Sequence, residues 1–540
     1  MSEELGAPTD FDLRTESPEE QRPRRAERSW WHWVDRVVIA ICIVGGVVLR
    51  FVAVTPLWLD ESLSVNIARL PLGQIPEALR HDGHPPLFYF LLHGWMKLFG
   101  PGDIAVRSLS GVFAVALLPL MWIAGNRLAG RRMAWIATAV AAVCPFTIRY
   151  GTEARMYALV MLLALAGWLL VGDALRKPTW LRLAGITALS AALLYSHYWA
   201  MWLLAAAAIG LLGKMRQARR AGHAEARQAQ LKVLLAMVAG GVLFLPWVPI
   251  LLYQGAHTGT PWGARVLPTG VIANTLADIG GGPTPEAVVF GGACAVLALV
   301  AIFCRPISQR YLEVDLWTRE DARPLLYIFG ATMALAMVVG YATQSTFVTR
   351  YTSVVFPFFI LLVALGLSRF QWPLIARCAM VVLLVLGTIG AVRTSYVEKR
   401  TEAAADVQEM VKTIRNGDVI AYCPDQLGPS TSRELDGKGN FDQVTYPDFK
   451  RPQRVDWVDY TDRVNKASPQ GFAQQLVQRA GNKQIYVVWS DGYERTHHQA
   501  CRNLIDAVSG LRPLHFQLLP LRGDNYYEPS TVWLFAKPNS

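Results

Sequence analysis

The chain has 540 residues, of which 53% are hydrophobic and 17% are charged, and its net charge is +11. Soluble domains contain about 25% charged residues, so the composition excludes an ordinary soluble protein. Most basic residues flank apolar runs, which indicates contact with the headgroups of membrane lipids and makes nucleic acid an unexpected partner.

Apolar runs recur from Val34 to Val392. Each is long enough to cross a bilayer core of about 30 Å, so the sequence predicts a polytopic α-helical membrane protein with about eleven spans. The predicted spans are residues 34–55, 104–126, 133–149, 155–175, 181–196, 198–213, 232–252, 285–304, 324–341, 351–369 and 373–393. Before them, residues 1–33 are polar and have no signal-peptide pattern, which predicts a disordered cytoplasmic tail.

The distribution of Lys and Arg predicts the orientation in the plasma membrane. Alternate connections are basic, as in the segment Lys214–Lys232, whereas the opposite connections at 151–154, 196–197, 253–283 and 341–350 contain no Lys or Arg other than Arg265 and Arg350. Basic connections stay in the cytoplasm, so the N-terminus is expected inside the cell. An odd number of spans then predicts that residues 394–540 lie outside the cytoplasm.

Residues 34–393 form the predicted transmembrane module, and its first outer loop, 56–103, is too apolar to be a separate domain. Residues 57–70 mix apolar and polar side chains as an interfacial amphipathic helix does. Pro86–Phe99 is apolar but too short to span comfortably, which predicts a re-entrant or surface helix.

Residues 394–540 alternate helical patterns with short apolar strands, which predicts a small α/β domain. Strands are expected at 418–422, 484–489 and 532–535, and the segment 433–452 is expected to be a polar loop. Cys423 and Cys501 are the two cysteines of this region. The sequence leaves open whether they form a disulfide, and no cysteine spacing indicates structural zinc.

Three residues of the first outer loop suit chemistry on a phosphate-linked substrate. Asp60 lies just past the first span, where a carboxylate could accept a proton from an acceptor hydroxyl. Glu61 could orient the acceptor, hold a metal or raise the pKa of Asp60 by repulsion. His84, before Pro85 and Pro86, could bind a phosphate or only fix a turn. The alternative for the acidic pair is a pair of solvated helix-capping carboxylates.

Five further candidates fall on the same predicted side of the membrane: Glu153, Arg155, His197, Arg350 and Tyr351. Ionisable groups at span ends usually face the bundle interior or a water-filled cavity. Arg155 also suits snorkelling to lipid headgroups, and the aromatic residues suit an interfacial belt. Because all these groups gather on one face, the sequence favours a substrate site there.

The order of these motifs resembles the C-type (GT-C) glycosyltransferases of the protein O-mannosyltransferase superfamily, which includes the lipid A aminoarabinose transferases. The similar features are Asp60-Glu61, Pro85-Pro86-Leu87, Arg107-Ser108-Leu109-Ser110, Glu153-Ala154-Arg155-Met156-Tyr157 and Arg350-Tyr351. The likeness covers roughly residues 34–393. In outline the chain also resembles actinobacterial cell-envelope mannosyl- and arabinosyltransferases.

The resemblance implies an enzyme that transfers a sugar from a polyprenyl-phosphate donor to a glycan, lipid or protein acceptor, with inversion and with Asp60 as general base. Arg155, Arg350 or His84 would meet the leaving phosphate. Many such enzymes use a divalent metal, for which Asp60, Glu61, Glu153 and His197 offer ligands without a fixed spacing. The competing functions are a lipid-linked oligosaccharide flippase or polymerase and a secondary transporter. A transporter is disfavoured because the spans contain almost no acidic residues.

Overall fold

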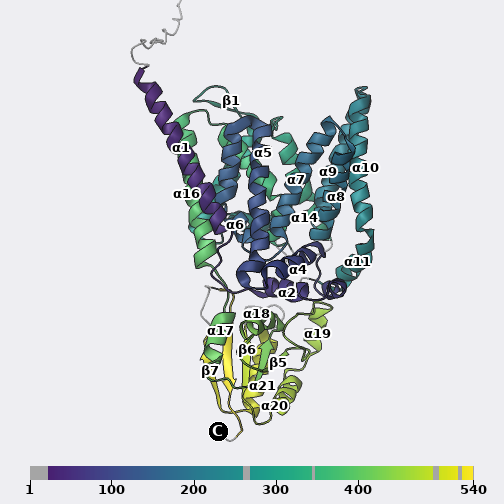
Figure 1. The fold of residues 1–540 in the computed structure, drawn as a ribbon, viewed down its shortest axis with the longest axis vertical. Coiled ribbons are helices and arrows are strands. Elements are labelled where there is room, and N and C mark those ends of the chain that lie inside the picture. Colours follow the sequence, from purple (N-terminus) through teal and green to yellow (C-terminus); the bar gives the residue numbers. More distant parts are fainter. Residues whose placement is uncertain (1–21, 260–267, 343–346, 491–497, 521–525, 539–540) are drawn as a thin grey trace, which may run out of the picture.

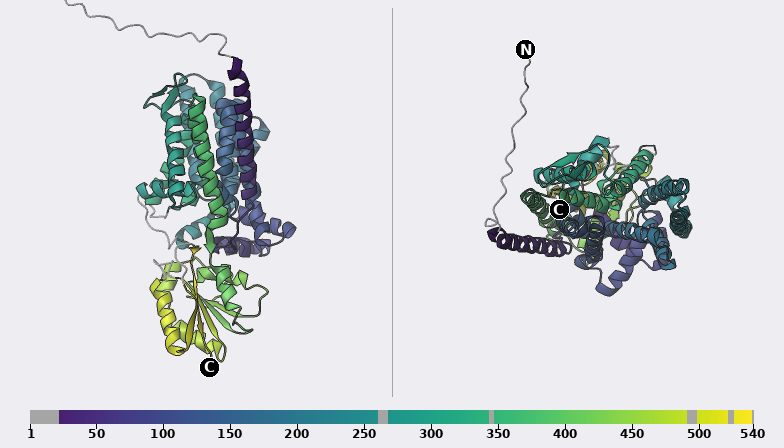
Figure 2. Two further views of the ribbon diagram at one scale, coloured as in Figure 1. Left: turned by 90° about the vertical axis from the view of Figure 1, so that its left-hand side faces the viewer. Right: turned by 90° about the horizontal axis from the view of Figure 1, so that it is seen from above.

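The computed structural model describes residues 22–259, 268–342, 347–490, 498–520 and 526–538. Long helices run side by side in one bundle, a layer of short helices crosses one end of it, and a sheet-containing unit lies beyond that layer (Figure 1). The first described helix (Arg22–Leu49) begins at the end of the molecule opposite the sheet-containing unit (Figure 2). This arrangement confirms the predicted fold class, a polytopic helical protein with a C-terminal α/β domain.

Every predicted span coincides with a helix. The bundle helices are α1 (Arg22–Leu49), α5 (Asp103–Val143), α6 (Pro145–Gly151), α7 (Tyr157–Arg176), α8 (Trp180–Ser196), α9 (Ala200–Arg220), α10 (Ala224–Phe244), α11 (Val248–His257), α12 (Pro268–Ile279), α13 (Pro285–Phe303), α14 (Arg323–Ala342), α15 (Phe356–Ser368) and α16 (Pro373–Val392). The label α5 covers two predicted spans, which turn at Gly130, where the backbone has a φ of 78°. α12 was not predicted, and α1 includes residues 22–33 of the predicted tail, whose remainder lies outside the described residues.

Within the described residues, six helical segments are long and apolar enough to cross a membrane. Shorter apolar helices, among them α8 and α15, complete the bundle. Exposed Val and Leu side chains on α10, α13 and α16 form an apolar outer surface that suits lipid. The chain is therefore a multi-pass membrane protein.

The predicted first outer loop, residues 56–103, forms the layer of short helices across one end of the bundle (Figure 1). It consists of α2 (Leu59–Ala68), the 3₁₀ helix η2 (Leu72–Gln74), α3 (Ile75–Arg80) and α4 (Leu87–Phe99). The predicted helices at 57–70 and 86–99 are α2 and α4. α2 is mostly buried rather than half-exposed, because α4 packs against one side of it and the C-terminal domain against the other.

The C-terminal domain has a five-stranded sheet in the order β5-β4-β6-β9-β7. The strands are β4 (Val419–Cys423), β5 (Asp442–Thr445), β6 (Ile485–Trp489), β7 (His515–Leu519) and β9 (Thr531–Phe535). β4, β5 and β6 are parallel, whereas β9 is antiparallel to its neighbours. The short helices are α17 (Ala403–Met410), η6 (Asp425–Leu427), α18 (Gly428–Glu434), α19 (Tyr460–Lys466), α20 (Pro469–Ala480) and α21 (His498–Leu511).

Alternation along β4 explains why helices cover both faces of this sheet. Val419 and Ala421 enter a core that includes α20 and α21, whereas Ile420 and Tyr422 enter the opposite core with α17. All five β4 residues are buried, as is typical of a central strand between two helical layers. The prediction of a polar loop at 433–452 was wrong in part, since β5 lies within it. β5 was not predicted because it is a short edge strand whose first half consists of the polar residues Asp442 and Gln443.

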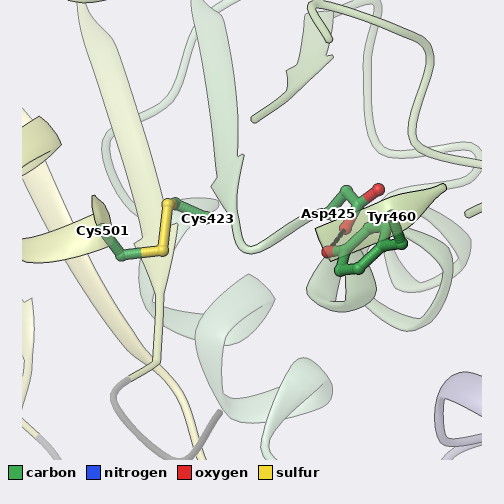
Figure 3. Close-up of a disulfide and its surroundings, with 4 residues drawn as sticks. All are labelled: Cys423, Asp425, Tyr460 and Cys501. Atoms are coloured by element: carbon green, nitrogen blue, oxygen red, sulfur yellow. Dashed lines mark hydrogen bonds between the residues drawn. A yellow bond between two sulfur atoms is a disulfide. The ribbon is translucent and has the colours of Figure 1, made fainter. Parts of the chain in front are cut away.

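Cys423 and Cys501 form a disulfide between the end of β4 and α21, with their Cα atoms 5.5 Å apart (Figure 3). Nearby, the Tyr460 hydroxyl donates a hydrogen bond to the buried carboxyl of Asp425. Burial raises the pKa of Asp425 to about 7. The disulfide answers a question that the sequence left open, and disulfides persist in oxidising compartments.

The C-terminal domain is joined tightly to the layer of short helices. An apolar cluster spans the junction and contains Trp58, Leu59, Leu63, Val455, Trp457, Tyr460 and Val464. Around it, Asn66 Nδ2 donates to the Gln453 carbonyl at 2.7 Å, and Arg433 contacts Asp103 at 2.8 Å. Because Leu59 and Leu63 belong to α2, the position of this helix depends directly on the C-terminal domain.

Candidate functional site

Asp60, in the first turn of α2, lies beside two arginines that are distant in sequence. Its Oδ2 atom is 3.0 Å from Nη1 of Arg350 and 3.7 Å from Nη2 of Arg155. Arg350 belongs to the 3₁₀ helix η4 (Thr349–Val354), and Arg155 lies in the turn between α6 and α7. The fold therefore brings together three of the residues selected from the sequence, with the carboxylate side chain still 14% exposed.

Arg155 is almost fully buried and its contacts are with protein groups. Its Nη1 atom donates to the hydroxyls of Ser64 and Tyr89, each at 3.2 Å, and its Nη2 atom lies 2.9 Å from Nε2 of His84. A guanidinium group has only donors, so Nε2 of His84 must accept. Snorkelling to lipid, the alternative from the sequence, does not describe an arginine that is 2% exposed.

His84 positions Arg155 in this structure. Since Nε2 accepts from Arg155, the proton lies on Nδ1, which donates to Oδ2 of Asp82 at 3.0 Å. The Tyr89 hydroxyl donates to the same oxygen at 2.9 Å. Burial raises the pKa of Asp82, but the contacts with His84, Arg155 and Tyr89 outweigh it and hold the pKa below its usual value. Both ring nitrogens of His84 are occupied, so its geometry favours orientation of Arg155 over direct phosphate contact.

Glu61 points away from Asp60 into a fully buried ion cluster. Nε and Nη2 of Arg107 donate to its two oxygens at 2.7 and 2.6 Å, and the Ala154 amide donates at 2.9 Å. Arg400 lies 3.6 Å away. Burial raises the pKa of Glu61, but these partners lower it to about 2. The expectation that Glu61 takes part in catalysis therefore has little geometric support, and we propose that its role is structural.

Glu61→Gln should lower stability more than activity. The change leaves the buried charges of Arg107 and Arg400 without their counter-ion, and breaking one side of a buried pair costs about 3–5 kcal/mol. The thermal unfolding midpoint in detergent measures this loss. Glu77→Gln, at an exposed position of the same layer, is the matched control and should leave the midpoint unchanged. An unchanged midpoint for Glu61→Gln would contradict the structural role.

Glu153 lies on the side of the cluster that faces the C-terminal domain. Its Oε2 atom accepts from Arg149 Nε at 3.2 Å, and burial raises its pKa. Arg149 also contacts Glu398, while Arg400 donates to the Thr152 carbonyl at 2.8 Å. The turn that contains Glu153 and Arg155 is thus fixed by residues that enter the C-terminal domain.

His197 and Tyr351 form an aromatic wall next to the ion pairs. The two ring centroids are 5.3 Å apart, and Tyr351 lies 5.4 Å from Trp199. Burial, together with Arg155 and Arg350, lowers the pKa of His197 to about 3, so its imidazole is neutral. The arrangement suits packing rather than binding of a phosphate.

Three buried N–H donors around Asp60 have no acceptor among the described residues: Nε of Arg155, Nε of Arg350 and Nε1 of Trp58. The Arg350 guanidinium also lies 5.9 Å from the Trp58 ring centroid. Unsatisfied buried donors are rare, because each costs about 1–3 kcal/mol. Their concentration beside one carboxylate indicates a site for a ligand that is rich in acceptor oxygens.

Comparison with known proteins places this geometry in a structural class. Residues 83–249 match the sequence model of the dolichyl-phosphate-mannose-protein mannosyltransferase family. No curated protein is significantly similar in sequence. Among solved structures, ArnT from Cupriavidus metallidurans is 12% identical, and the alignment covers 95% of this chain and all of that one. Its undecaprenyl-phosphate-bound and apo forms align with TM-scores of 0.55 and 0.56.

The chain has the GT-C fold. The recognition made from the short motifs is confirmed at this level. An oligosaccharyltransferase from Archaeoglobus fulgidus, solved with zinc and sulfate, is also similar at 12% identity over 83% of this chain and 67% of that one, with a TM-score of 0.47.

The metal ligands considered from the sequence do not form a set in this GT-C chain. Within the described residues, no three His, Cys, Asp or Glu side chains are grouped as a metal site requires. Asp60 faces arginines, Glu61 is enclosed by them, and the Nδ1 atom of His197 accepts from the Trp199 amide at 3.1 Å.

Sequence reasoning missed several members of this candidate site: Trp58, Asp82, Tyr89, Arg107, Arg400 and Tyr527. Asp82 stands two residues before His84, so the pair could have been recognised as a potential hydrogen-bonded turn. Arg107 had been noted only as a motif residue. Arg400 and Tyr527 carry no local signal, because the C-terminal domain brings them to the site from far along the chain.

Proposed function

We propose that this protein transfers a sugar from a polyprenyl-phosphate donor to an acceptor on the outer face of the membrane, with inversion at the anomeric carbon. The observation that carries the proposal is the pairing of Asp60 with Arg155 and Arg350, whose Nε–H groups have no acceptor within the described parts of the chain. The matched mannosyltransferase family and the undecaprenyl phosphate in the ArnT structure support a lipid-phosphate donor.

The donor phosphate would bind to Arg155 and Arg350. Guanidinium groups bind phosphate through charge-assisted hydrogen bonds, which are stronger where water is scarce. In the free protein both arginines instead hold Asp60. A bound phosphate would compete for their N–H groups and release the carboxylate, so donor binding itself would prepare the base.

The transfer step requires one base and no acid. Asp60 accepts the proton of the acceptor hydroxyl as its oxygen attacks the anomeric carbon from the side opposite the phosphate. The bond between the anomeric carbon and the phosphate oxygen breaks, and its electron pair leaves with polyprenyl phosphate. Arg155 and Arg350 stabilise the charge that develops on this leaving group. Asp60 then loses its proton to water.

We further propose a hexose or pentose of the mannose or arabinose type as the sugar, and an acceptor of the cell envelope: a glycan, a lipid or a protein. The support is the matched family and the resemblance in motif order. The described C-terminal domain has ion pairs of its own, such as Arg463 with Asp448, but Asp60, Arg155 and Arg350 all precede it in the chain, so we assign it the task of positioning the acceptor.

The test is incubation of the purified full chain with mannosyl, arabinofuranosyl and aminoarabinosyl polyprenyl phosphates. We expect one of them to release polyprenyl phosphate together with sugar transfer or hydrolysis, measured by chromatography. The Glu77→Gln variant, changed at an exposed acid of the same layer, should retain the reaction. A protein that binds polyprenyl phosphate but consumes none of these donors would contradict the proposal.

We also propose that the N-terminus is cytoplasmic and that residues 394–540 lie outside. The uneven distribution of Lys and Arg and the Cys423–Cys501 disulfide support this orientation. Lys466 and His223 are both exposed, so a cysteine at either position can react with a maleimide that reaches its side of the membrane. With an impermeant maleimide on intact cells, Lys466→Cys should therefore be labelled and His223→Cys should not. Labelling of His223→Cys in intact cells would reverse the assignment.

A further inference from the structure

Tyr527 reaches the candidate site from the far end of the chain. It lies in β8 (Tyr526–Glu528), which pairs in parallel with β3 (Lys399–Thr401), the strand that follows α16. β3 is fixed in turn, because Arg400 is buried and bound to Thr152 beside Glu61. The two-stranded β3–β8 ladder therefore holds Tyr527 in a defined place next to the transmembrane module.

Tyr527 contacts side chains of the site but remains largely exposed to solvent. Its ring meets that of Trp58 edge-to-face, with centroids 5.1 Å apart, and Arg149 lies 5.9 Å from its centroid. Trp58 is two residues before Asp60. Yet Tyr527 is 60% exposed, whereas Glu528 beside it is buried. A large aromatic ring is thus accessible next to the proposed base.

The charged groups of the site act on Tyr527 directly. Asp60, Glu153, Arg350 and Arg149 all interact electrostatically with its phenol group. Electrostatic interaction with all four groups places the phenol at the edge of the ion cluster. Tyr526 lies on the opposite face of the strand, where its ring is 5.3 Å from the Lys399 ammonium.

We infer that Tyr527 is the outer wall of the acceptor site and stacks on a sugar ring of a saccharide acceptor. An aromatic ring offers apolar surface for the C–H face of a sugar, while its hydroxyl and neighbouring charged groups can hydrogen-bond to the sugar hydroxyls. This inference rests on the proposed function and narrows its acceptor from a glycan, lipid or protein to a glycan or glycolipid.

The position of Tyr527 favours contact with the acceptor over contact with the donor. Arg155 and Arg350 meet Asp60 from the turns and helices of the transmembrane module, where a lipid-linked phosphate would arrive. Tyr527 meets the same site from the C-terminal domain, in strand β8, through its contact with Trp58. The acceptor hydroxyl must approach the anomeric carbon opposite the phosphate, so we place the acceptor on the side of the C-terminal domain, which carries Tyr527.

The experiment measures binding, so that it does not depend on turnover. The full chain in detergent is titrated by calorimetry with soluble mannose and arabinose oligosaccharides. We expect Tyr527→Ala to raise the Kd about tenfold, which corresponds to the upper end of the range for one aromatic contact. Tyr527→Phe should retain most of the affinity because it keeps the ring. Tyr526→Ala is the matched control and should bind as the unchanged protein does.

Two further results separate this inference from the proposed function. Tyr527→Ala should bind polyprenyl phosphate as tightly as the unchanged chain, because Arg155 and Arg350, rather than Tyr527, bind the phosphate. A loss of this binding would overturn the acceptor assignment. Absence of oligosaccharide binding by the unchanged chain, or equal Kd values for Tyr527→Ala and Tyr526→Ala, would also overturn it. None of these outcomes determines whether the unchanged protein cleaves the donor, so donor cleavage remains a separate test of the proposed function.

Discussion

Asp60→Asn should lower kcat for sugar transfer by about 10²–10⁴-fold, the usual range for loss of a general base. Asn keeps the size of the side chain but cannot accept the proton of the acceptor hydroxyl. The same change should tighten the binding of polyprenyl phosphate, because the carboxylate that competes with phosphate for Arg155 and Arg350 is gone. Initial rates and a titration with polyprenyl phosphate measure the two effects.

The opposite movement of kcat and affinity makes this prediction specific. Loss of the fold would weaken both, whereas removal of a base that competes with the ligand weakens one and strengthens the other. Glu77→Gln controls for the removal of an acidic group from the outer layer. Transfer within tenfold of the unchanged chain would exclude Asp60 as the base.

The architecture was largely predictable because membrane spans carry a strong local signal. An apolar run of sufficient length has few alternatives to a helix in a bilayer, so each predicted span coincides with a helix. α12 was missed because its 12 residues are short and only moderately apolar. β3 and β8 were missed for another reason: each has three residues and exists through its pairing with the other.

The candidate site was predictable as a set of residues but not as a set of roles. Charge on the predicted outer side of an apolar chain directed attention to Asp60, Arg155 and Arg350, which the fold brings together. The neighbouring Glu61 looked equivalent in sequence. One step along α2 turns a side chain by about 100°, which places Glu61 in a buried ion cluster while Asp60 keeps some exposure. Helical periodicity predicts that Asp60 and Glu61 point in different directions, but their roles follow only when the residues that pack against each face of α2 are known.

Arg155→Gln and Arg350→Gln should each lower kcat/KM for the donor by about 10²–10³-fold, the range for loss of one group that stabilises developing charge. The contact strengthens as charge collects on the leaving phosphate, so kcat should fall together with donor affinity. Lys should restore either position only in part, since it keeps the charge but loses the fork of donors. Steady-state kinetics over a range of donor concentrations provide the measurement.

A double substitution distinguishes direct phosphate binding by Arg350 from a role limited to its ion pair with Asp60. If Arg350 acts only through Asp60, then Arg350→Gln should have no further effect on phosphate affinity once Asp60 is Asn. If Arg350 binds the phosphate, its loss should raise the Kd for polyprenyl phosphate in both backgrounds. The second outcome is expected, because Nε of Arg350 has no acceptor among the described residues even while Nη1 is paired with Asp60. Equal Kd values for Asp60→Asn and the double variant would reduce Arg350 to a partner of the base.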